Sequence, residues 1–371
     1  MTDERRIAVV GGGLAGAATA FFLAAERNAR VTLVEREPRH DAHGSGRSAE
    51  ILRVAADDPV TRALALQSSV LLDDPASIGL EVHAPLVDRR GLFVVSGPDA
   101  PAWAAPLVDA GAAERTSVDE LRARAPHFTP TGSNVHWLPG GGRVHVARLL
   151  PALVRGAVRR GAAIARTAGE ARVVVDGTAV RGVSAPGVAP IEADDVVVAA
   201  GAWTRETAAS LGLSLPLRPT RRHACVTAPD PALDPRAPIV WDDVAGFYAR
   251  QESGAWCVSA CDVTDVDPAE RPRYAPSEGA LARVRELVAR HLGDFAIARS
   301  WSGFRDLVPD DRPILGPDGR VEGLHWCAGL GGHGVTLSLA VGRAAAEAVL
   351  GRPDDLAQAC SRARFETPVN A

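Results

Sequence analysis

Short apolar runs that end in glycine recur along the chain. The clearest lie at 7–10, 195–201 and 324–328, and each contains few polar residues. Such runs are typical of strands that are buried on both faces of a parallel sheet. After the first run, residues 15–27 are rich in alanine and free of proline, which predicts a helix, and residues 30–35 predict a second strand. These elements together form a βαβ unit.

The rest of the chain alternates between helical and strand-like stretches. Apolar spacing and terminal residues predict further helices at 59–72, 118–124, 146–160, 279–292 and 336–350. Runs rich in β-branched and aromatic residues predict a strand at 92–95, a hairpin of 172–175 with 180–183, and, within 215–272, short strands at 239–241, 246–250 and 256–261. The change to short strands after residue 215 indicates an antiparallel sheet.

The order of these elements predicts an α/β protein with an α+β second domain. A Rossmann-like parallel sheet would be assembled from three separate segments, at 1–80, 145–212 and 300–371. An antiparallel sheet that binds the substrate would be inserted between them, at 81–144 and 213–299. With 371 residues, the chain is long enough for two such domains.

The first predicted strand ends in a glycine-rich turn at residues 11–16 (GGGLAG). Gly11, Gly13 and Gly16 have the spacing of a dinucleotide-binding turn. There the glycines allow a tight turn, a close approach of the backbone to a pyrophosphate, and close packing of the helix on the strand. Glu35 ends the second strand, where a carboxylate can accept a hydrogen bond from a ribose hydroxyl. The pattern predicts a bound dinucleotide, which is either NAD or FAD.

The composition excludes several other functions. All 41 lysine plus arginine residues are arginine, so the chain has no lysine for a Schiff base or a P-loop. The net charge of −4 argues against a general nucleic-acid binder, and the five cysteines lack zinc-site spacing. No apolar run is long enough to span a membrane. The polar start at 1–6 leaves no room for a secretory signal, so we expect a cytoplasmic protein. Because the cysteines lack zinc-site spacing, we expect no metal.

Four further stretches bear on the choice between NAD and FAD. They are 43–49 (HGSGRSA), 199–203 (AAGAW), 301–310 (WSGFRDLVPD) followed by 312–316 (RPILG), and 329–336 (GLGGHGVT). Together with the glycine turn they resemble the FAD-dependent amine oxidoreductases of the D-amino-acid oxidase, glycine oxidase and sarcosine oxidase superfamily, and among these the D-arginine dehydrogenases. The likeness runs from Ile7 to about Leu350 and implies FAD as the cofactor.

The resemblance implies a site for this cofactor. The small residues of the 43–49 loop would admit its pyrophosphate, Arg47 would offer a bidentate contact to phosphate, and the start of the last helix would stabilise negative charge on the reduced flavin. Gly303 stands where sarcosine oxidases link the flavin through cysteine, so the FAD would be noncovalent. The residues implied to contact FAD are Gly11, Gly13, Leu14, Ala15, Gly16, Glu35, Arg36, Gly44, Ser45, Arg47, Ser48, Glu170, Gly201, Trp203, Gly303, Gly331, Gly332, His333, Gly334, Val335 and Thr336.

The resemblance also implies a substrate site, with Arg305, Tyr248 and His333 as its catalytic residues. Arg305 would grip the substrate carboxylate, a task that suits a rigid planar guanidinium, and Tyr248 would hydrogen-bond the same group. Arg222 and Arg53 would contact the substrate as well. As one of two adjacent arginines, Arg222 also fits a solvated strand edge. His333 would either lie near the flavin or only pack beside it.

The side chain of the substrate is less well indicated. Ile51, Ala56 and Leu92 stand where D-arginine dehydrogenases have polar residues, so arginine is not the expected substrate. An apolar or aromatic side chain is easier to fit. Trp137 and Trp241 would then be wall residues of the pocket, although both also fit a protein core.

The reaction implied is oxidation of the C–N bond of an amino acid or related secondary amine by hydride transfer to the flavin, giving an imine. The electron acceptor would be oxygen or a quinone-type acceptor. The lysine that speeds oxygen reduction in related oxidases cannot be present in a lysine-free chain, which favours a dehydrogenase. The alternatives are an NADPH-dependent aromatic monooxygenase, a nicotinamide dehydrogenase and an FAD-binding module without enzyme activity.

Overall fold

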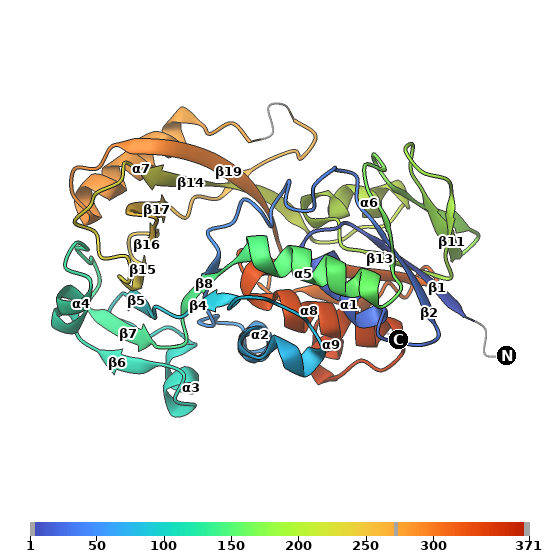
Figure 1. Ribbon diagram of the computed structural model, residues 1–371, viewed down its shortest axis with the longest axis horizontal. Helices are drawn as coiled ribbons and strands as arrows, with labels where there is room; N and C mark the ends of the chain where they lie inside the picture. Colours follow the sequence, from blue (N-terminus) through green and yellow to red (C-terminus); the bar gives the residue numbers. More distant parts are fainter. Residues whose placement is uncertain (1–3, 271–273, 367–371) are drawn as a thin grey trace.

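A computed structural model describes residues 4–270 and 274–366. Part of the polar start, at 1–3, and the end of the region predicted to hold short strands, at 271–272, lie outside the described residues. The described chain forms two regions that lie next to each other, each built on its own large sheet (Figure 1).

The first region contains a six-stranded sheet in which five strands are parallel. β1 lies near its centre and pairs with β2 on one side and β13 on the other. The carboxyl ends of the parallel strands therefore share one edge, the edge at which α/β sheets bind ligands. In spatial order the strands are β20 (Ile314–Pro317, antiparallel), β21 (Leu324–Ala328), β13 (Asp195–Val198), β1 (Arg5–Val10), β2 (Ala29–Val34) and β9 (Ala163–Ala165).

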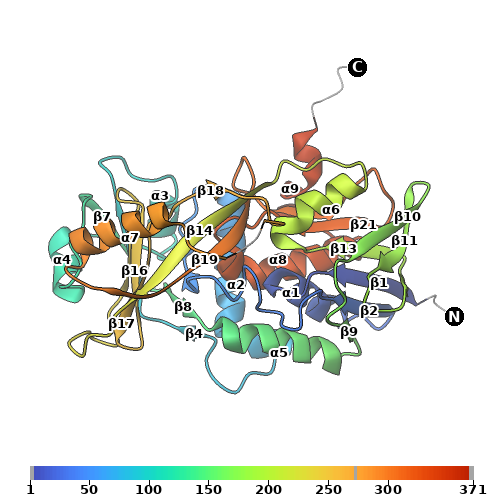
Figure 2. The ribbon, with the colours of Figure 1, turned by 90° about the horizontal axis from the view of Figure 1, so that it is seen from above.

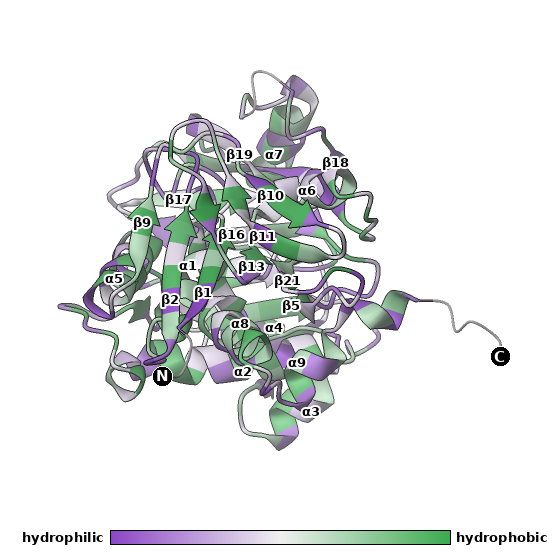
Figure 3. Ribbon diagram, turned by 90° about the vertical axis from the view of Figure 1, so that its right-hand side faces the viewer, coloured by the Kyte–Doolittle hydropathy of each residue, from purple (hydrophilic) through white to green (hydrophobic). Residues whose placement is uncertain are grey.

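Both faces of this sheet are covered, which explains why its strands are so apolar. Ile7 and Val9 pack in one cluster with helices, and Ala8 and Val10 pack in a second cluster against a small β-sheet. In Figure 3, β1 changes from the purple of its two arginines to the green of these buried residues. The helices are α1 (Leu14–Leu23), α2 (Pro59–Asp73), α5 (Val146–Arg159) and α8 (Gly334–Val349), and the small sheet is β10 (Arg172–Asp176), β11 (Ala179–Ser184) and β12 (Ile191–Glu192).

The second region is built on a larger and mostly antiparallel sheet, in which β5 and β15 are a parallel pair. Helix α7 (Glu278–His291) packs on this sheet through a cluster that contains Val284 and Leu287. In spatial order the strands are β18 (Thr264–Asp265), β14 (Arg218–Thr227), β17 (Ala255–Ser259), β16 (Phe247–Glu252), β15 (Ile239–Asp242), β5 (Leu92–Ser96), β7 (Asn134–Leu138) and β6 (Glu114–Thr116), with β19 (Ile297–Leu307) paired to β14.

Two long strands connect the regions. β14 and β19 pair from Arg218 with Leu307 to Thr227 with Ile297. They run side by side from the antiparallel sheet towards the parallel one (Figures 1 and 2). The remaining elements are the sheet of β3 (Ile51–Leu52), β8 (Gly142–Val144) and β4 (Val87–Asp88), the helices α3 (Ala104–Asp109), α4 (Val118–Arg124), α6 (Thr204–Ser210) and α9 (Asp355–Ala359), and the 3-10 helices η1 (Pro75–Ile78), η2 (Gly201–Trp203) and η3 (Arg362–Phe365).

The predicted architecture, a parallel sheet combined with an antiparallel one, is confirmed. The helix predicted at 15–27 and the strand predicted at 195–201 both end early. α1 ends at Leu23, and β13 ends at Val198, shortly before η2 begins. The sequence did not predict β19, and it did not predict β14 as one long strand. The division of the chain into two discontinuous domains remains a prediction.

Candidate active site

The glycine turn begins where β1 ends. The Gly11 amide donates a hydrogen bond to the Val34 carbonyl at 2.8 Å, and its φ of +105° is one that glycine adopts without steric cost. A Cβ on Gly16 would overlap the Gly11 carbonyl oxygen, so α1 packs as closely on the strand as the dinucleotide pattern requires. The amide of Leu14, in the first turn of α1, donates to the Ser45 hydroxyl at 3.0 Å. The turn and the 43–49 loop therefore form one wall.

Glu35 is held in place by two backbone amides. Its carboxylate accepts hydrogen bonds from the Gly12 amide at 2.7 Å and the Glu37 amide at 2.8 Å. The side chain is buried beside the glycine turn and lines the cavity described next. A carboxylate has more acceptor sites than these two amides occupy, so Glu35 can still accept hydrogen bonds from ribose hydroxyls.

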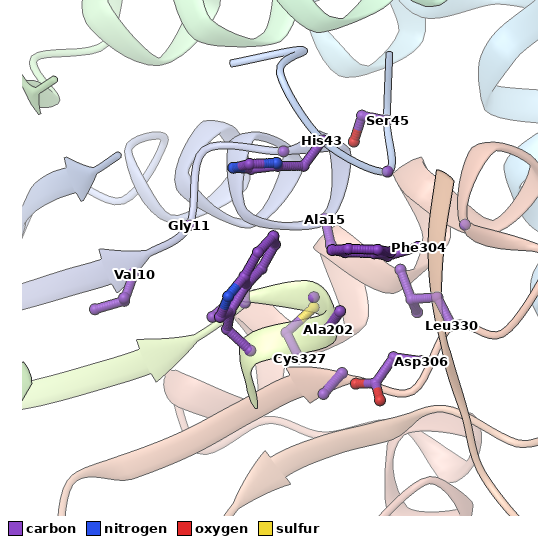
Figure 4. A pocket seen from close by; sticks show the side chains of 18 of the residues that line it. Val10, Gly11, Ala15, His43, Ser45, Ala202, Phe304, Asp306, Cys327 and Leu330 are labelled. Atoms are coloured by element: carbon purple, nitrogen blue, oxygen red, sulfur yellow. The ribbon is translucent and has the colours of Figure 1, made fainter. Parts of the chain in front are cut away.

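A cavity of about 560 Å³ lies over the carboxyl edge of the parallel sheet. Figure 4 shows it between the end of β1, the 43–49 loop, η2 and the loop that follows β21. Most residues predicted to contact the cofactor line it, and these are Gly11, Gly13, Leu14, Ala15, Glu35, Arg36, Gly44, Ser45, Ser48, Glu170, Gly201, Trp203, Gly331, Gly332, Gly334 and Val335.

Arg47 and Gly303 are not among the lining residues. The Arg47 guanidinium lies 3.7 Å from the centre of the Tyr274 ring, and its Nε donates to the Ala42 carbonyl at 3.1 Å. A Cβ on Gly303 would lie 3.0 Å from the Arg47 carbonyl oxygen, so β19 approaches the 43–49 loop closely at this point. The phosphate contact of Arg47 and the noncovalent attachment of FAD remain predictions.

Gly16, His333 and Thr336 also lie outside the lining. Gly16 serves the close packing of α1, as described above. The Thr336 hydroxyl donates to the Ile51 carbonyl at 3.2 Å and accepts from the Arg53 amide at 3.1 Å, so it ties the start of α8 to β3. His333 is the N-cap residue of α8, which begins at Gly334.

Asp306 lines the cavity and was not singled out from the sequence. Its side chain points into the cavity near Leu330 and Cys327 (Figure 4). Both carboxyl oxygens are buried and have no hydrogen-bond partner among the described residues. Burial raises its pKa to about 8. An acidic residue directly beside Arg305 in the motif was the available signal. Other lining residues that were missed include His40, His43, Glu206, Thr207, Ser210 and Phe304.

Buried polar atoms without partners indicate that a polar ligand belongs in this cavity. Among the described residues they include Arg36 Nη2, Arg305 Nε and both oxygens of Asp306. The Arg36 guanidinium is held 3.9 Å from the centre of a Trp203 ring at the cavity wall. Because buried polar groups are normally hydrogen-bonded, a ligand that carries phosphates, hydroxyls and ring nitrogens fits this lining. The glycine turn and Glu35 fit a dinucleotide in particular.

A second group of polar side chains lies where β19, β16 and the start of α8 meet. Arg305 is half-buried, and burial together with the charge of Arg222 lowers its pKa to about 10, so it remains a cation at neutral pH. Tyr248 is buried, its ring centre is 4.8 Å from that of Trp241, and burial raises its pKa, so its hydroxyl keeps its proton. The structure therefore combines a permanent cation and a neutral hydroxyl.

His333 and Arg53 complete this group. Burial, and then the charges of Arg53, Arg222 and Arg305, lower the pKa of His333 to about 4, so its imidazole is neutral at neutral pH. Arg53 lies over the Trp241 ring at 4.4 Å. The predicted residues Arg53, Arg222, Tyr248, Arg305 and His333 thus come together with Trp241 from separate segments of the chain.

Trp137 does not belong to this group. It packs on Phe93, with ring centres 4.6 Å apart, and Arg124 lies 3.6 Å from the centre of its ring. Of the two tryptophans considered as wall residues, the structure brings only Trp241 to the predicted substrate residues.

The model of the family described as FAD dependent oxidoreductase (DAO) matches residues 6–348. The chain belongs to this family. FAD is therefore its cofactor, and the prediction of FAD rather than NAD is confirmed. The resemblance to the D-amino-acid oxidase superfamily is confirmed by the same match, and this member of the family is an FAD-dependent oxidoreductase.

Relatives of this family member act on different compounds. The bifunctional protein MnmC of tRNA 5-methylaminomethyl-2-thiouridine biosynthesis from Verminephrobacter eiseniae is 29% identical over 391 residues, which cover 93% of this chain and 60% of that protein. D-amino acid dehydrogenase 2 of Pseudomonas aeruginosa is 34% identical over 191 residues, which cover 50% of this chain and 43% of that protein. The chain thus spans less than two thirds of the length of these two relatives.

Two solved structures share the whole fold. Glycine oxidase from Geobacillus kaustophilus has a TM-score of 0.81 at 25% identity, with 98% of this chain and 100% of that chain covered. L-proline dehydrogenase from P. horikoshii has a TM-score of 0.84 at 20% identity, with 98% of each chain covered, and supports the fold alone. No helix in the described part of the chain is long and apolar enough to cross a membrane.

Proposed function

We propose that the protein oxidises the C–N bond of an amino acid or a related secondary amine to an imine. The observation that carries this proposal is Arg305, a half-buried guanidinium at the rim of the FAD cavity whose Nε has no partner among the described residues. A rigid planar cation in that position suits a carboxylate, because it can form two parallel hydrogen bonds. The relatives named as D-amino acid dehydrogenase and glycine oxidase support the same class of substrate.

Arg305 and Tyr248 would orient the substrate. Arg305 would bind the carboxylate, and the protonated Tyr248 hydroxyl would donate a further hydrogen bond to it. Two contacts hold the carboxylate in one orientation and thereby limit the positions that Cα can take, and such positioning lowers the barrier by removing part of the rotational freedom beforehand. FAD supplies the hydride acceptor when it is bound.

Hydride loss from Cα requires that the substrate amine is deprotonated. His333 adds no charge at neutral pH, because its pKa lies near 4. We propose that its neutral ring would lie against the bound cofactor and that the amides at the start of α8 would stabilise negative charge on the reduced flavin.

An anaerobic substrate panel tests the proposal. The FAD-loaded protein is mixed with D- and L-amino acids and with N-methyl amines, and reduction is followed by bleaching of the flavin. At least one compound with a carboxylate next to the amine carbon should bleach it. Consumption of NADPH with an aromatic compound would instead indicate a monooxygenase, and failure of every amine would indicate an FAD-binding module without this activity. For the final electron acceptor we propose a quinone-type compound or oxygen. Adding each of the two to the bleached protein and comparing the rates of flavin reoxidation distinguishes them.

A further inference from the structure

Three arginines converge on the loop that opens α8. Arg53 follows β3, Arg222 lies on β14 and Arg305 lies on β19. A Cβ placed on Gly332 would lie 3.7 Å from Arg305 Nε and 3.8 Å from Arg222 Nη1, so these two guanidinium groups flank the same small volume. The neighbouring His333 lies within the electrostatic reach of all three arginines.

Only Arg53 among the three has an acidic partner in the described part of the chain. Its Nη2 lies 3.3 Å from the Asp243 carboxylate. Arg222 Nε donates to the backbone carbonyl of Asp262 at 3.2 Å, which supplies no negative charge. The carboxylate of Asp262 is already bound to the ring of His223 at 2.7 Å.

Arg305 has neither an ion pair nor a side-chain hydrogen bond within residues 4–270 and 274–366. It and Arg222 are therefore two neighbouring, half-buried cations, neither of which is ion-paired to a carboxylate of the described residues. The Asp262 carboxylate, whose charge reaches both, is bound to His223. A charge that is partly removed from water destabilises the protein unless a partner compensates it. One substrate carboxylate balances one of the two cations and leaves the other unbalanced.

We propose that the substrate carries two carboxylates, as an acidic amino acid does, and that Arg222 binds the second. This inference rests on the proposed function, in which Arg305 and Tyr248 hold the first carboxylate. Two carboxylates would balance Arg305 and Arg222, while Asp243 continues to balance Arg53. The apolar side chain that the sequence favoured would leave the guanidinium of Arg222 without an anion.

The test compares acids with the corresponding amides, which differ in charge but hardly in size. Oxidation of D- and L-aspartate, asparagine, glutamate and glutamine is measured with the FAD-loaded protein and a dye as electron acceptor. For at least one pair, kcat/KM for the acid should exceed that for the amide by about 100-fold, because the amide leaves a buried cation without its partner. In Arg222→Gln this ratio should fall by at least about tenfold.

The matched control is Arg218→Gln on the same strand. Arg218 is exposed and pairs with Asp265 at 2.6 Å on the surface, so its loss should leave the ratio unchanged. A readout without turnover covers the case of an inactive Arg222→Gln variant. Glutarate should shift the flavin absorbance of the wild type at a lower concentration than butyrate does, and Arg222→Gln should remove most of that difference while Arg222→Lys keeps part of it.

The two proposals fail in different ways. If amides are oxidised as well as acids, or if Arg222→Gln leaves the acid-to-amide ratio and the glutarate preference unchanged, the proposal of a second carboxylate is wrong. The proposed oxidation of an amine is then unaffected. If no amino acid or N-methyl amine bleaches the flavin under anaerobic conditions, the proposed function itself is wrong.

Discussion

The cofactor cavity and the arginine cluster next to it are built in different ways. The wall of the cavity is made largely of backbone and small residues, of which Gly11, Gly13 and Ala15 lie within one short stretch of sequence. The arginine cluster is made of long charged side chains, and Arg53, Arg222 and Arg305 come from segments far apart in the chain. Under the function proposed above, backbone geometry would bind the cofactor and side-chain charge would select the substrate. The two parts should therefore respond separately to mutation.

The largest effect is expected at the glycine turn. In Gly16→Val the new side chain would overlap the Gly11 carbonyl, so the turn and α1 cannot keep their close approach. We expect the variant to purify without FAD, measured as the loss of flavin absorbance after desalting. In the control Gly279→Ala, a Cβ meets nothing within 4 Å, and the protein should stay yellow. A fully loaded Gly16→Val protein would contradict this view of the turn.

Asp306 should couple stability to pH. Its folded pKa of about 8 lies above the unfolded value, so between roughly pH 4 and pH 8 the unfolded chain has released a proton that the folded protein keeps. The stability of the wild type should therefore fall as the pH rises through this range, by about 3 kcal/mol between pH 5 and pH 8 from this residue. Asp306→Asn should lack that loss. Urea unfolding at fixed excess FAD measures it, and equal slopes for both proteins would refute the effect.

Glu35 should matter for FAD affinity and little for the substrate. In Glu35→Gln the charge that holds the amides of Gly12 and Glu37 is lost, and so is an acceptor for the ribose. The Kd for FAD should rise by about tenfold, from one charge-assisted hydrogen bond. Fluorescence titration of apoprotein with FAD measures the change, with the surface variant Glu192→Gln as control. If the FAD-loaded variant shows a raised KM for substrate at unchanged Kd, the two parts of the site are not separable here.

Tyr248 should matter for the substrate and little for FAD affinity, and the effect should be smaller than that of Glu35. Tyr248→Phe keeps the buried ring beside Trp241 and removes only the hydroxyl. KM for a carboxylate substrate should rise about five- to tenfold, as expected for one hydrogen bond, while the Kd for FAD stays the same. Steady-state kinetics with the compound of the panel that has the highest kcat/KM measure this change in KM. A drop in FAD affinity would place the hydroxyl in the cofactor site instead.

The sequence predicted the cofactor side of this molecule better than the substrate side. The apolar residues of β1 and β2 have no solvated face, and the turn between β1 and α1 follows a local pattern of glycines, so both could be recognised from neighbouring residues. For Asp306 the neighbouring Arg305 was the only local signal, and the burial of Asp306 could not be predicted because it depends on elements far from it in the chain.

The strands of the substrate side gave a weaker signal. β14 contains Arg218, Arg221 and Arg222, and β19 contains Arg305 and Asp306, so neither strand alternates cleanly between apolar and polar residues. Residues that line a site replace the apolar ones that would reveal a strand, and local rules fail at functional positions for this reason. The family resemblance supplied Arg222 and Arg305, but their mutual proximity depends on the pairing of β14 with β19, which only the structure gives.

The most direct test of the account is Arg305→Ala, with FAD binding and substrate binding measured on the same preparation. The protein is mixed anaerobically with increasing concentrations of the best amino acid of the panel, and the rate of flavin bleaching is measured. We expect full FAD content and a half-saturating concentration for this rate at least about 100-fold higher than in the wild type, because the charge partner of the carboxylate is gone. Arg218→Ala should behave as the wild type. A half-saturating concentration of Arg305→Ala equal to that of the wild type would contradict the claim that this guanidinium binds the substrate carboxylate.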